Sequence, residues 1–559
     1  MEKIYSRSIF WGIAAFAAVL SGGFVQSLHA ASVAKWERFE ESFESSIDYK
    51  NPVQEVQFGA EFTTGKLTVK VPGFWDGGKT WKIRFSPTRE GRWTYRTMSS
   101  DAGNNGLNNK SGEFTCSPQS GDTPFKKHGP IQVAPDHRYL MHQDGTPFFF
   151  LADTAWNGPL LSTPEEWNTY IRERTRQKFS AVQWVATQWR AAPKGDIENH
   201  LAYTGKEKIE INPAFFQRMD ARVEAVDKAG LLSVPVLLWA LEGGANPQVN
   251  PGVSLPDDQA ILLARYIVAR WGANNVLWIL GGDGNYSGPK AEKWKKIGRA
   301  VFSDIAHAPV TMHPGGMQWV WDEFKDETWY DIVGYQSGHG DDARTLSWLI
   351  DGPVTDDWMR LPHRPFINLE PPYEGHLAYQ SKKPITADFT RRAIYWSLLG
   401  APTAGVSYGA HGVWGWDDGK TPPTDHPGTG TPQSWQKALT MPGAEQMKSL
   451  VDFMNSIDWW HLRPTPMFVV NNPGKDKPER FVAAARTDLK DLMLVYIPED
   501  RTIEIKLNAL PPSPNITWVN PRTGEKSPAV AVVTTDTCQF PTPAEGDWIL
   551  LMKTGDKQK

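Results

Sequence analysis

The sequence predicts an α/β fold, a (β/α)8 TIM barrel flanked by N-terminal and C-terminal β-sandwich domains. Between residues 147 and 455, short apolar runs alternate with longer helical patterns in eight units. Continuous apolar strands that alternate with helices indicate a parallel sheet covered by helices. Outside this span, short alternating strands separated by Gly and Pro turns are typical of β-sandwiches. We expect four segments: a signal peptide at 1–34, an Ig-like sandwich at 35–122, the catalytic barrel at 130–458 and a second sandwich at 459–559.

The start of the chain has the three parts of a secretory signal peptide. Lys3 and Arg7 supply positive charge, residues 9–20 are apolar, and small residues follow, with cleavage after Ala30 or after Ala34 as the alternatives. The apolar run is short for a membrane span. We expect an exported protein, periplasmic or extracellular after cleavage, with no membrane span in the mature chain; an uncleaved anchor is the alternative.

The N-terminal sandwich is predicted from β-rich runs punctuated by Gly and Pro. A Gly- and Asn-rich stretch at 101–112 predicts a long hairpin loop, and 117–130 has the composition of a linker. The expected strands lie at 53–62, 66–71, 81–85 and 92–97.

The barrel is predicted unit by unit. Its strands are expected at 148–152, 181–186, 231–239, 276–280, 310–313, 330–335, 366–369 and 405–408. Its helices are expected at 164–179, 213–229, 257–271, 290–306, 345–358, 387–399 and 444–455. The connection after the fifth strand is poorly defined.

The second sandwich follows Trp459 and Trp460, where strand patterns return between Asn-Pro and Pro-Pro turns. Export permits disulfides, but Cys116 and Cys538 fall in different predicted domains, so the sequence leaves their pairing open. The expected strands lie at 468–471, 480–486, 492–497, 503–507, 517–520, 530–535 and 548–552.

Composition and motifs exclude several function classes. A formal net charge of −4 argues against a nucleic-acid-binding surface, which is usually basic. The sequence has no zinc-protease, P-loop or dinucleotide-binding motif, so we expect no metal and no cofactor. The 26 Trp and 15 Tyr suit stacking on sugar rings, but they also suit a core.

Two carboxylates end apolar runs of the predicted barrel. Asp283 follows residues 276–282, and Glu370 follows residues 365–369. In such barrels the carboxyl ends of the strands form the active site. Glycoside hydrolysis needs two carboxyl groups, one to protonate the leaving oxygen and one to attack the sugar or activate water. Asp283 and Glu370 are therefore the predicted catalytic pair, and two buried structural acids are the alternative.

Polar and aromatic residues at the other strand ends should surround the same pocket. Asp153 either braces the barrel mouth or binds a sugar hydroxyl, and Trp414 and Trp416 lie in a Gly-rich setting that favours an exposed platform. Glu374 ranks behind Glu370 because it lies in a loop. The long loops 190–211 and 415–435 are expected to decide between endo and exo action. The predicted substrate-binding residues are Asp153, Trp156, Gln188, Trp239, Asn285, His313, Gln336, His339, Tyr373, Tyr408, His411, Trp414 and Trp416.

Four motifs carry a resemblance to a known family. They are Leu151-Ala152-Asp153-Thr154-Ala155-Trp156, Gly281-Gly282-Asp283-Gly284-Asn285, Asn368-Leu369-Glu370-Pro371 and Tyr408-Gly409-Ala410-His411-Gly412-Val413-Trp414. With them the chain resembles the apiosidase-like barrels, which include glycoside hydrolase family 140. The resemblance implies that Asp283 is the acid/base and Glu370 the nucleophile of a retaining mechanism. Related retaining barrels usually have Asn-Glu where this chain has Gly282-Asp283, so the shorter acid needs a different backbone geometry.

The flanking segments also resemble known domains. Gly73-Phe74-Trp75-Asp76-Gly77-Gly78 and Phe85-Ser86-Pro87 resemble an N-terminal sandwich often fused to such barrels. Trp518-Val519-Asn520-Pro521-Arg522-Thr523-Gly524 resembles a C-terminal sandwich of the collagen-binding type.

Together these features predict an exported glycoside hydrolase that acts on plant or algal cell-wall polysaccharides or oligosaccharides, with apiose release as the activity that the resemblance implies. The expected partner is the poly- or oligosaccharide substrate, without nucleic acid, and the oligomeric state stays open. A non-catalytic carbohydrate-binding or adhesion protein is the first alternative. A collagen-directed protein is the second.

Overall fold

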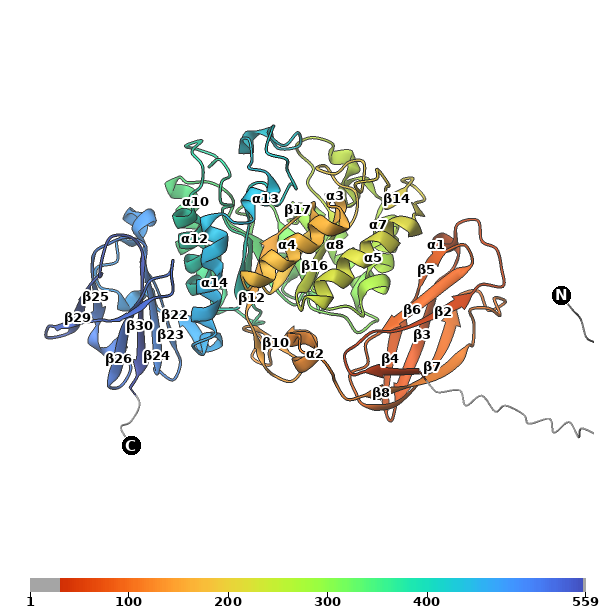
Figure 1. Ribbon diagram of the computed structural model, residues 1–559, viewed down its shortest axis with the longest axis horizontal. Helices are drawn as coiled ribbons and strands as arrows, with labels where there is room; N and C mark the ends of the chain where they lie inside the picture. The colour runs from red at the N-terminus through yellow and green to blue at the C-terminus, as the bar shows by residue number, and fades with distance from the viewer. Residues whose placement is uncertain (1–30, 556–559) are drawn as a thin grey trace, which may run out of the picture.

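The computed structural model describes residues 31–555. A parallel barrel lies between two β-sandwiches, with the N-terminal sandwich on one side and the C-terminal sandwich on the other (Figure 1). The predicted fold class is therefore confirmed.

All eight predicted barrel strands are present and parallel. The ring closes between the fifth and sixth strands, where Thr311 pairs with Ile332 and the Thr311 hydroxyl donates to the Ile332 carbonyl over 2.9 Å. In chain order the strands are β12 (Phe150–Thr154), β13 (Ala181–Val185), β16 (Leu232–Trp239), β17 (Trp278–Gly284), β18 (Val310–Pro314), β19 (Val333–Gln336), β20 (Phe366–Glu370) and β21 (Gly405–Tyr408).

Helices cover the barrel largely as predicted. The capping box between Thr163 and Glu166 starts the first of them. The predicted helix at 345–358 is instead two helices, because Gly352 between them has an extended backbone. The main helices are α4 (Pro164–Arg176), α5 (Pro213–Lys228), α7 (Asp257–Trp271), α8 (Pro289–Phe302), α10 (Ala343–Asp351), α11 (Pro353–Asp357), α12 (Ala387–Gly400) and α14 (Pro442–Met454). After β18 there is only the short α9 (Trp321–Phe324).

The N-terminal sandwich packs a five-stranded sheet against a three-stranded sheet around buried aromatic rings. The start of the predicted strand at 53–62 is wrong, because Pro52 opens a short helix, α1 (Pro52–Glu55). The strands are β1 (Ala31–Ala34), β8 (Ser111–Ser117), β7 (Gly91–Ser99), β3 (Phe58–Thr64) and β4 (Leu67–Pro72), facing β2 (Phe39–Glu44), β6 (Thr80–Phe85) and β5 (Phe74–Gly77).

Strand β1 lies before residue 35, the expected start of this domain. Residues 31–34 pair in parallel with 114–117, so a sandwich that began at residue 35 would lack this strand. The rest of the predicted signal peptide, residues 1–30, lies outside the described residues. The expected linker at 117–130 contains α2 (Pro124–His128). A small sheet of β9 (Ile131–Val133), β10 (Leu140–His142) and β11 (Pro147–Phe148) then leads into the barrel (Figure 1).

The C-terminal sandwich has a six-stranded and a three-stranded sheet. The predicted strand at 468–471 is wrong: a 3-10 turn ends there, and only Val469 forms a bridge, to Ile505. Both cysteines are buried and free, one in each sandwich. The strands are β22 (Leu462–Pro464), β23 (Ala483–Thr487), β24 (Leu492–Ile497), β30 (Trp548–Thr554), β26 (Pro514–Val519) and β27 (Lys526–Pro528), facing β25 (Thr502–Lys506), β29 (Thr537–Pro541) and β28 (Val532–Val533).

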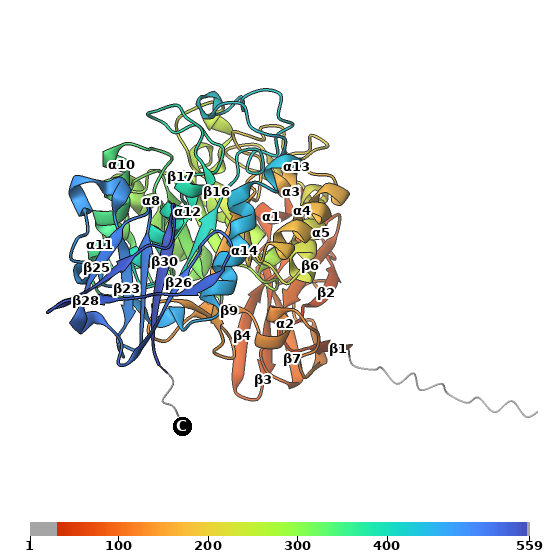
Figure 2. The same cartoon turned by 60° about the vertical axis from the view of Figure 1, so that its left-hand side comes forward.

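Both sandwiches are attached to the outer helices of the barrel. On the N-terminal side, Arg84 of β6 pairs with Asp220 of α5 at 2.7 Å. On the C-terminal side, Arg391 of α12 pairs with Asp547 at 2.7 Å, and the Tyr395 and Tyr496 rings stack at 4.6 Å. In Figure 2 the loops at the top of the barrel extend above the C-terminal sandwich. Within residues 31–555, no helix combines the length and apolar character needed to cross a membrane.

Candidate active site

A cavity of about 270 Å³ opens at the carboxyl ends of the barrel strands. Each of the eight strands or the loop that follows it contributes to the wall, so the strand ends surround one pocket. Asp283 and Glu370 both line it. The complete set of lining residues is Trp156, Trp189, Arg190, Trp239, Asp283, Gly316, Gln336, Gly338, His339, Glu370, Tyr373, His376, Tyr379, Trp414 and His426.

Asp283 reaches this pocket through an irregular backbone. The β17–β18 pairing shifts register between Gly282 and Gly284, and Asp283 lies in this shift with a left-handed φ of 48°. Bulges of this kind re-aim side chains beside active sites, and left-handed non-glycine residues are often found there. A Cβ at Gly282 would lie 2.6 Å from the Trp239 ring, so this position accepts only glycine without rearrangement. The Gly282-Asp283 pair therefore supplies the different backbone geometry that the shorter acid requires.

The surroundings of Asp283 favour its protonated form. Burial is the main reason that its pKa rises to about 6, and the Glu370 carboxylate raises this pKa further. The side-chain amide of Gln336 donates to Asp283 Oδ1 over 2.9 Å and opposes the rise. Gln336 itself is held by the Pro314 carbonyl at 2.8 Å. Asp283 can therefore carry a proton near neutral pH, as a general acid must.

Glu370 is the last residue of β20 and lies at a second register shift, between β19 and β20. Its Oε1 is 2.9 Å from His339 Nε2, and its Oε2 is 3.5 Å from His313 Nε2. Burial raises the pKa of Glu370, while His313 and Tyr373 oppose that rise. The two carboxyl groups thus have different neighbours: an amide donor beside Asp283, and imidazoles beside Glu370.

The tautomer of His339 follows from its second contact. The backbone N–H of Tyr373 donates to His339 Nδ1 over 3.2 Å, so Nδ1 carries no proton. The proton is then on Nε2, which donates to Glu370 Oε1. Burial lowers the pKa of His339 to about 3, in agreement with a neutral ring. His339 therefore fixes one oxygen of Glu370 and leaves Oε2 as the freer one.

Tryptophans form the walls around the carboxylates. Trp156 and Trp239 pack edge to face with centroids 5.4 Å apart, and Trp189 lies 4.4 Å from Trp239. The His313 ring is 5.4 Å from Trp156, behind Glu370 rather than among the lining residues. Aromatic faces of this kind suit the apolar faces of sugar rings.

Two predicted binding residues face away from the pocket. Asp153 and Tyr408 are register partners on adjacent strands, so their side chains lie on the same side of the sheet. Asp153 accepts from Arg174 Nε of α4 at 2.8 Å and from the Tyr170 hydroxyl at 2.7 Å. The Tyr408 hydroxyl donates to Glu374 Oε2 over 2.6 Å. We expected Asp153 and Tyr408 to contact the sugar. This expectation is wrong, because both side chains point into the helix layer.

Other predicted residues support loops instead of lining the cavity. Gln188 holds the following loop through the Tyr203 carbonyl, at 3.0 Å, and the Ala202 N–H, at 2.9 Å. Asn285 is exposed, and its side-chain oxygen accepts a hydrogen bond from the backbone N–H of Ser287. His411 is not a lining residue; its ring lies 5.4 Å from that of His376, which does line the cavity.

The expected exposed platform of Trp414 and Trp416 is wrong, since both side chains are buried. Trp414 lines the cavity, whereas Trp416 stacks on Trp435 at 4.4 Å, outside the set of lining residues. The Gly-rich segment is therefore folded back into the barrel mouth.

The predicted substrate-binding residues leave out seven lining residues, although the first four stand in strand-end runs that the sequence places at the mouth. They are Trp189, Arg190, Gly316, Gly338, His376, Tyr379 and His426. The two glycines leave no side-chain signal. His376, Tyr379 and His426 lie in loops without periodicity, and only their position after the seventh and eighth strands could have indicated them. Arg190 lies two positions after the predicted Gln188, and its positive charge beside two predicted acids was the signal available there.

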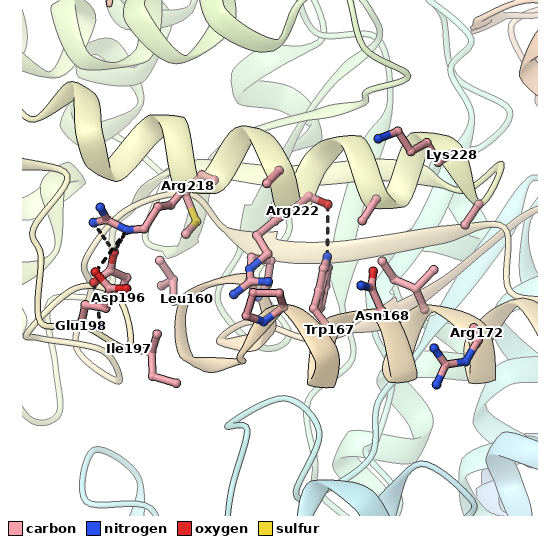
Figure 3. A pocket seen from close by; sticks show the side chains of 17 residues that line it. Leu160, Trp167, Asn168, Arg172, Asp196, Ile197, Glu198, Arg218, Arg222 and Lys228 are labelled. Atoms are coloured by element: carbon pink, nitrogen blue, oxygen red, sulfur yellow. Dashed lines mark hydrogen bonds and ion pairs between the residues drawn. The ribbon is translucent and has the colours of Figure 1, made fainter. Parts of the chain in front are cut away.

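A larger cavity of about 760 Å³ lies between α4 and α5, on the outer surface of the barrel (Figure 3). Its two acids share one cation, because Arg218 lies 2.6 Å from Asp196 and 4.0 Å from Glu198. The Trp167 indole N–H donates to the Arg222 carbonyl. The two acids of this groove are therefore neutralised by an arginine, whereas in the mouth the charge of Glu370 acts on Asp283. Among residues 31–555, no three His, Cys, Asp or Glu side chains are grouped so as to hold a metal ion.

Family comparisons divide the chain into three parts. "Apiosidase-like, catalytic domain" matches residues 134–461, more than half of the chain. A domain of unknown function, DUF5060, matches residues 32–100, and "Putative collagen-binding domain of a collagenase" matches residues 464–553. No curated protein matches the chain.

Several solved structures share the fold. One described as "Glycoside hydrolase" has 21% identity and a TM-score of 0.68, covering 78% of this chain and 100% of its own. A glycoside hydrolase family 5 protein from Bacteroides vulgatus ATCC 8482 has 21% identity and a TM-score of 0.67, covering 78% and 96%. A "putative glycoside hydrolase" from the same organism has 18% identity and a TM-score of 0.71, covering 94% and 99%. At these identities the likeness shows the fold.

Proposed function

The chain belongs to the apiosidase-like catalytic domain family, and from that membership we propose that it is an exported glycoside hydrolase of plant or algal cell-wall polysaccharides or oligosaccharides. The observation that carries the proposal is the pair Asp283 and Glu370 in one tryptophan-walled pocket. Their different neighbours separate an acid from a nucleophile, which is the pattern that two catalytic carboxyl groups require.

In the proposed first step, Glu370 Oε2 attacks the anomeric carbon while Asp283 gives its proton to the leaving oxygen. Two features support these roles. His339 ties Oε1 of Glu370, which leaves the other oxygen to attack. With a pKa of about 6, Asp283 is about half protonated at pH 6 and still about one tenth protonated at pH 7.

In the second step, Asp283 takes a proton from water, and the resulting hydroxide replaces Glu370 at the anomeric carbon. The charge of Glu370 is one cause of the high pKa of Asp283. When Glu370 becomes an ester that charge disappears, so the pKa of Asp283 falls. The fall suits the change of Asp283 from acid to base.

This mechanism retains the anomeric configuration and requires carboxyl groups about 5–5.5 Å apart; a separation of about 6.5–9.5 Å would indicate inversion, with Glu370 as the base. Proton NMR of the first-formed anomer distinguishes the two.

Apiose release from pectin side chains is the family-based first candidate for the reaction. A plant and algal glycan panel, read by the sugar released, tests the proposal, with Glu370→Gln as the matched inactive protein. Release by the wild type alone supports it. No release from any glycan, together with equal glycan binding by both proteins, would favour the non-catalytic carbohydrate-binding alternative.

Export is the remaining part of the proposal. The charged and apolar start of the chain supports it, and strand β1 favours cleavage after Ala30 because cleavage after Ala34 would remove a paired strand. Mass spectrometry of the soluble protein should give an N-terminus at Ala31. An intact Met1 would contradict export by cleavage.

A further inference from the structure

One side of the pocket is crossed by a segment of the long loop that joins β21 to α13 (Trp435–Ala438). We call residues 425–429 of this loop the strap. Arg190, from the loop after β13, anchors its first residue: Arg190 Nη1 is 3.1 Å from the Asp425 carbonyl oxygen and 3.2 Å from Asp425 Oδ2. Arg190 and Asp425 are both 7% exposed, so the anchor is a buried ion pair rather than a transient surface contact.

The strap is also fastened on its other side, to the loop after β20. The backbone N–H of Leu377 donates to the Thr429 carbonyl over 3.0 Å. Between the two anchors, His426 lines the pocket, with its ring 6.3 Å from Tyr379 and 6.0 Å from His376. The strap therefore joins the loops after β13 and β20 across the mouth.

The small size of the pocket agrees with binding of a single sugar residue. A cavity of about 270 Å³ is smaller than the ~300–1,000 Å³ clefts that hold drug-sized ligands. A polysaccharide bound through internal residues needs a groove that is open at both ends, whereas the strap bridges the loops after β13 and β20 and puts His426 in the pocket wall.

Building on the proposed glycosidase function, we infer that the pocket accepts only a terminal sugar residue, so that the enzyme acts in the exo mode with the strap as the chain-end determinant. Each event breaks one glycosidic C–O bond, consumes one water and releases one monosaccharide. Asp425 and His426 decide this specificity by position and need no part in the proton transfers.

The direct test is the size of the first products from cell-wall polysaccharides and reduced oligosaccharides of defined length. Exo action predicts monosaccharide as the sole early product and a polysaccharide viscosity that stays unchanged during early release. Early oligosaccharides with a rapid loss of viscosity would overturn the inference and still support a glycosidase. Release of no sugar at all would remove the proposed function, and the inference with it.

Opening the strap gives a second test. In the double variant Asp425→Ala/His426→Gly, we expect the ratio of oligosaccharide to monosaccharide products to rise at least tenfold. Asp418→Asn is the matched control in the same loop, because Asp418 is exposed and contacts Lys420 at 2.8 Å; its product ratio should stay that of the wild type. A folded double variant, verified by circular dichroism, that still makes only monosaccharide would contradict the role of the strap.

Discussion

Asp283 and Asp153 are both acids at the ends of buried strands in one barrel, but their surroundings differ. Burial raises the pKa of both carboxyl groups. At Asp153 the adjacent Arg174 guanidinium opposes the rise, whereas at Asp283 the Glu370 carboxylate adds to it. Asp153 forms a buried ion pair with Arg174 between the sheet and the helices, whereas the surroundings of Asp283 suit an acid that gives and takes a proton.

The difference depends on which way the strand turns the side chain. Asp153 follows the regular alternation of β12 and faces α4. Asp283 lies in a register shift with a left-handed backbone, which turns it into the mouth. An acid at a strand end can therefore reach a substrate only if the local backbone aims it into the pocket.

The largest expected effect is at Glu370, the proposed nucleophile. Glu370→Ala should lower kcat by about 10⁴-fold or more on every substrate, because it removes the group proposed to form the covalent intermediate. Initial rates at saturating substrate measure this. Glu374→Gln is the matched control, since Glu374 accepts from Tyr408 in the helix layer and should keep kcat near the wild-type value. Near-normal turnover by Glu370→Ala would refute the assigned role.

The next effect is at the acid. Asp283→Ala should lower kcat by about 10²–10⁴-fold on natural substrates and less on substrates with good leaving groups, which need less protonation. Added azide should restore part of the rate by attacking the intermediate in the space left by the carboxylate. Rates with a series of aryl leaving groups measure this. Rescue of Glu370→Ala by leaving-group quality, in place of Asp283→Ala, would reverse the assignment.

Asp153, the acid that faces the helix layer, should affect the stability of the fold and not the rate of the reaction. Asp153→Asn leaves the fully buried Arg174 without its anion and should cost about 3–5 kcal/mol of unfolding free energy. Denaturant unfolding gives this value, and kcat per folded molecule should stay unchanged. A large loss of kcat in a folded and stable Asp153→Asn protein would place Asp153 in the chemistry and end the contrast with Asp283.

The smallest effect is a shift in pH dependence. The proton donor must be protonated, so kcat/KM should fall as pH rises through the pKa of Asp283, about 6. Gln336 stabilises the ionised form of Asp283, so Gln336→Leu should raise that pKa and move the alkaline limb upward, by about 1 pH unit or less. A pH profile of both proteins measures the shift, and a downward movement would show that Asp283 is not the group that titrates.

The sequence was sufficient to predict two kinds of feature: elements that repeat along the chain, and polar residues that end an apolar run. The eight strands were visible as apolar segments, and Glu370 was visible as the polar residue that ends one of them. The direction of Asp153 was not visible, because an acid after an apolar run gives the same signal whether it faces the pocket or the helices. Tyr170 and Arg174, four residues apart on α4, were the available sign of a polar partner for it.

The mouth was harder to predict because long-range contacts define it. His426 and Tyr379 come from different loops without periodicity and meet only after the barrel closes. Trp416 stood in a Gly-rich stretch that indicated exposure, but Trp435, nineteen positions later, covers it by stacking. The composition of a short segment does not indicate which distant residues will pack against it.

The central claim is that Glu370 forms the covalent bond to the sugar while Asp283 handles the proton. The most direct measurement is to trap the intermediate in Asp283→Ala with an activated aryl glycoside of the released sugar, followed by peptide mapping by mass spectrometry. The predicted result is the mass of one sugar residue on the peptide that contains Glu370, absent from a Glu370→Gln/Asp283→Ala control. An adduct on another residue, or an unmodified Glu370 with an inverted first-formed anomer, would contradict the claim.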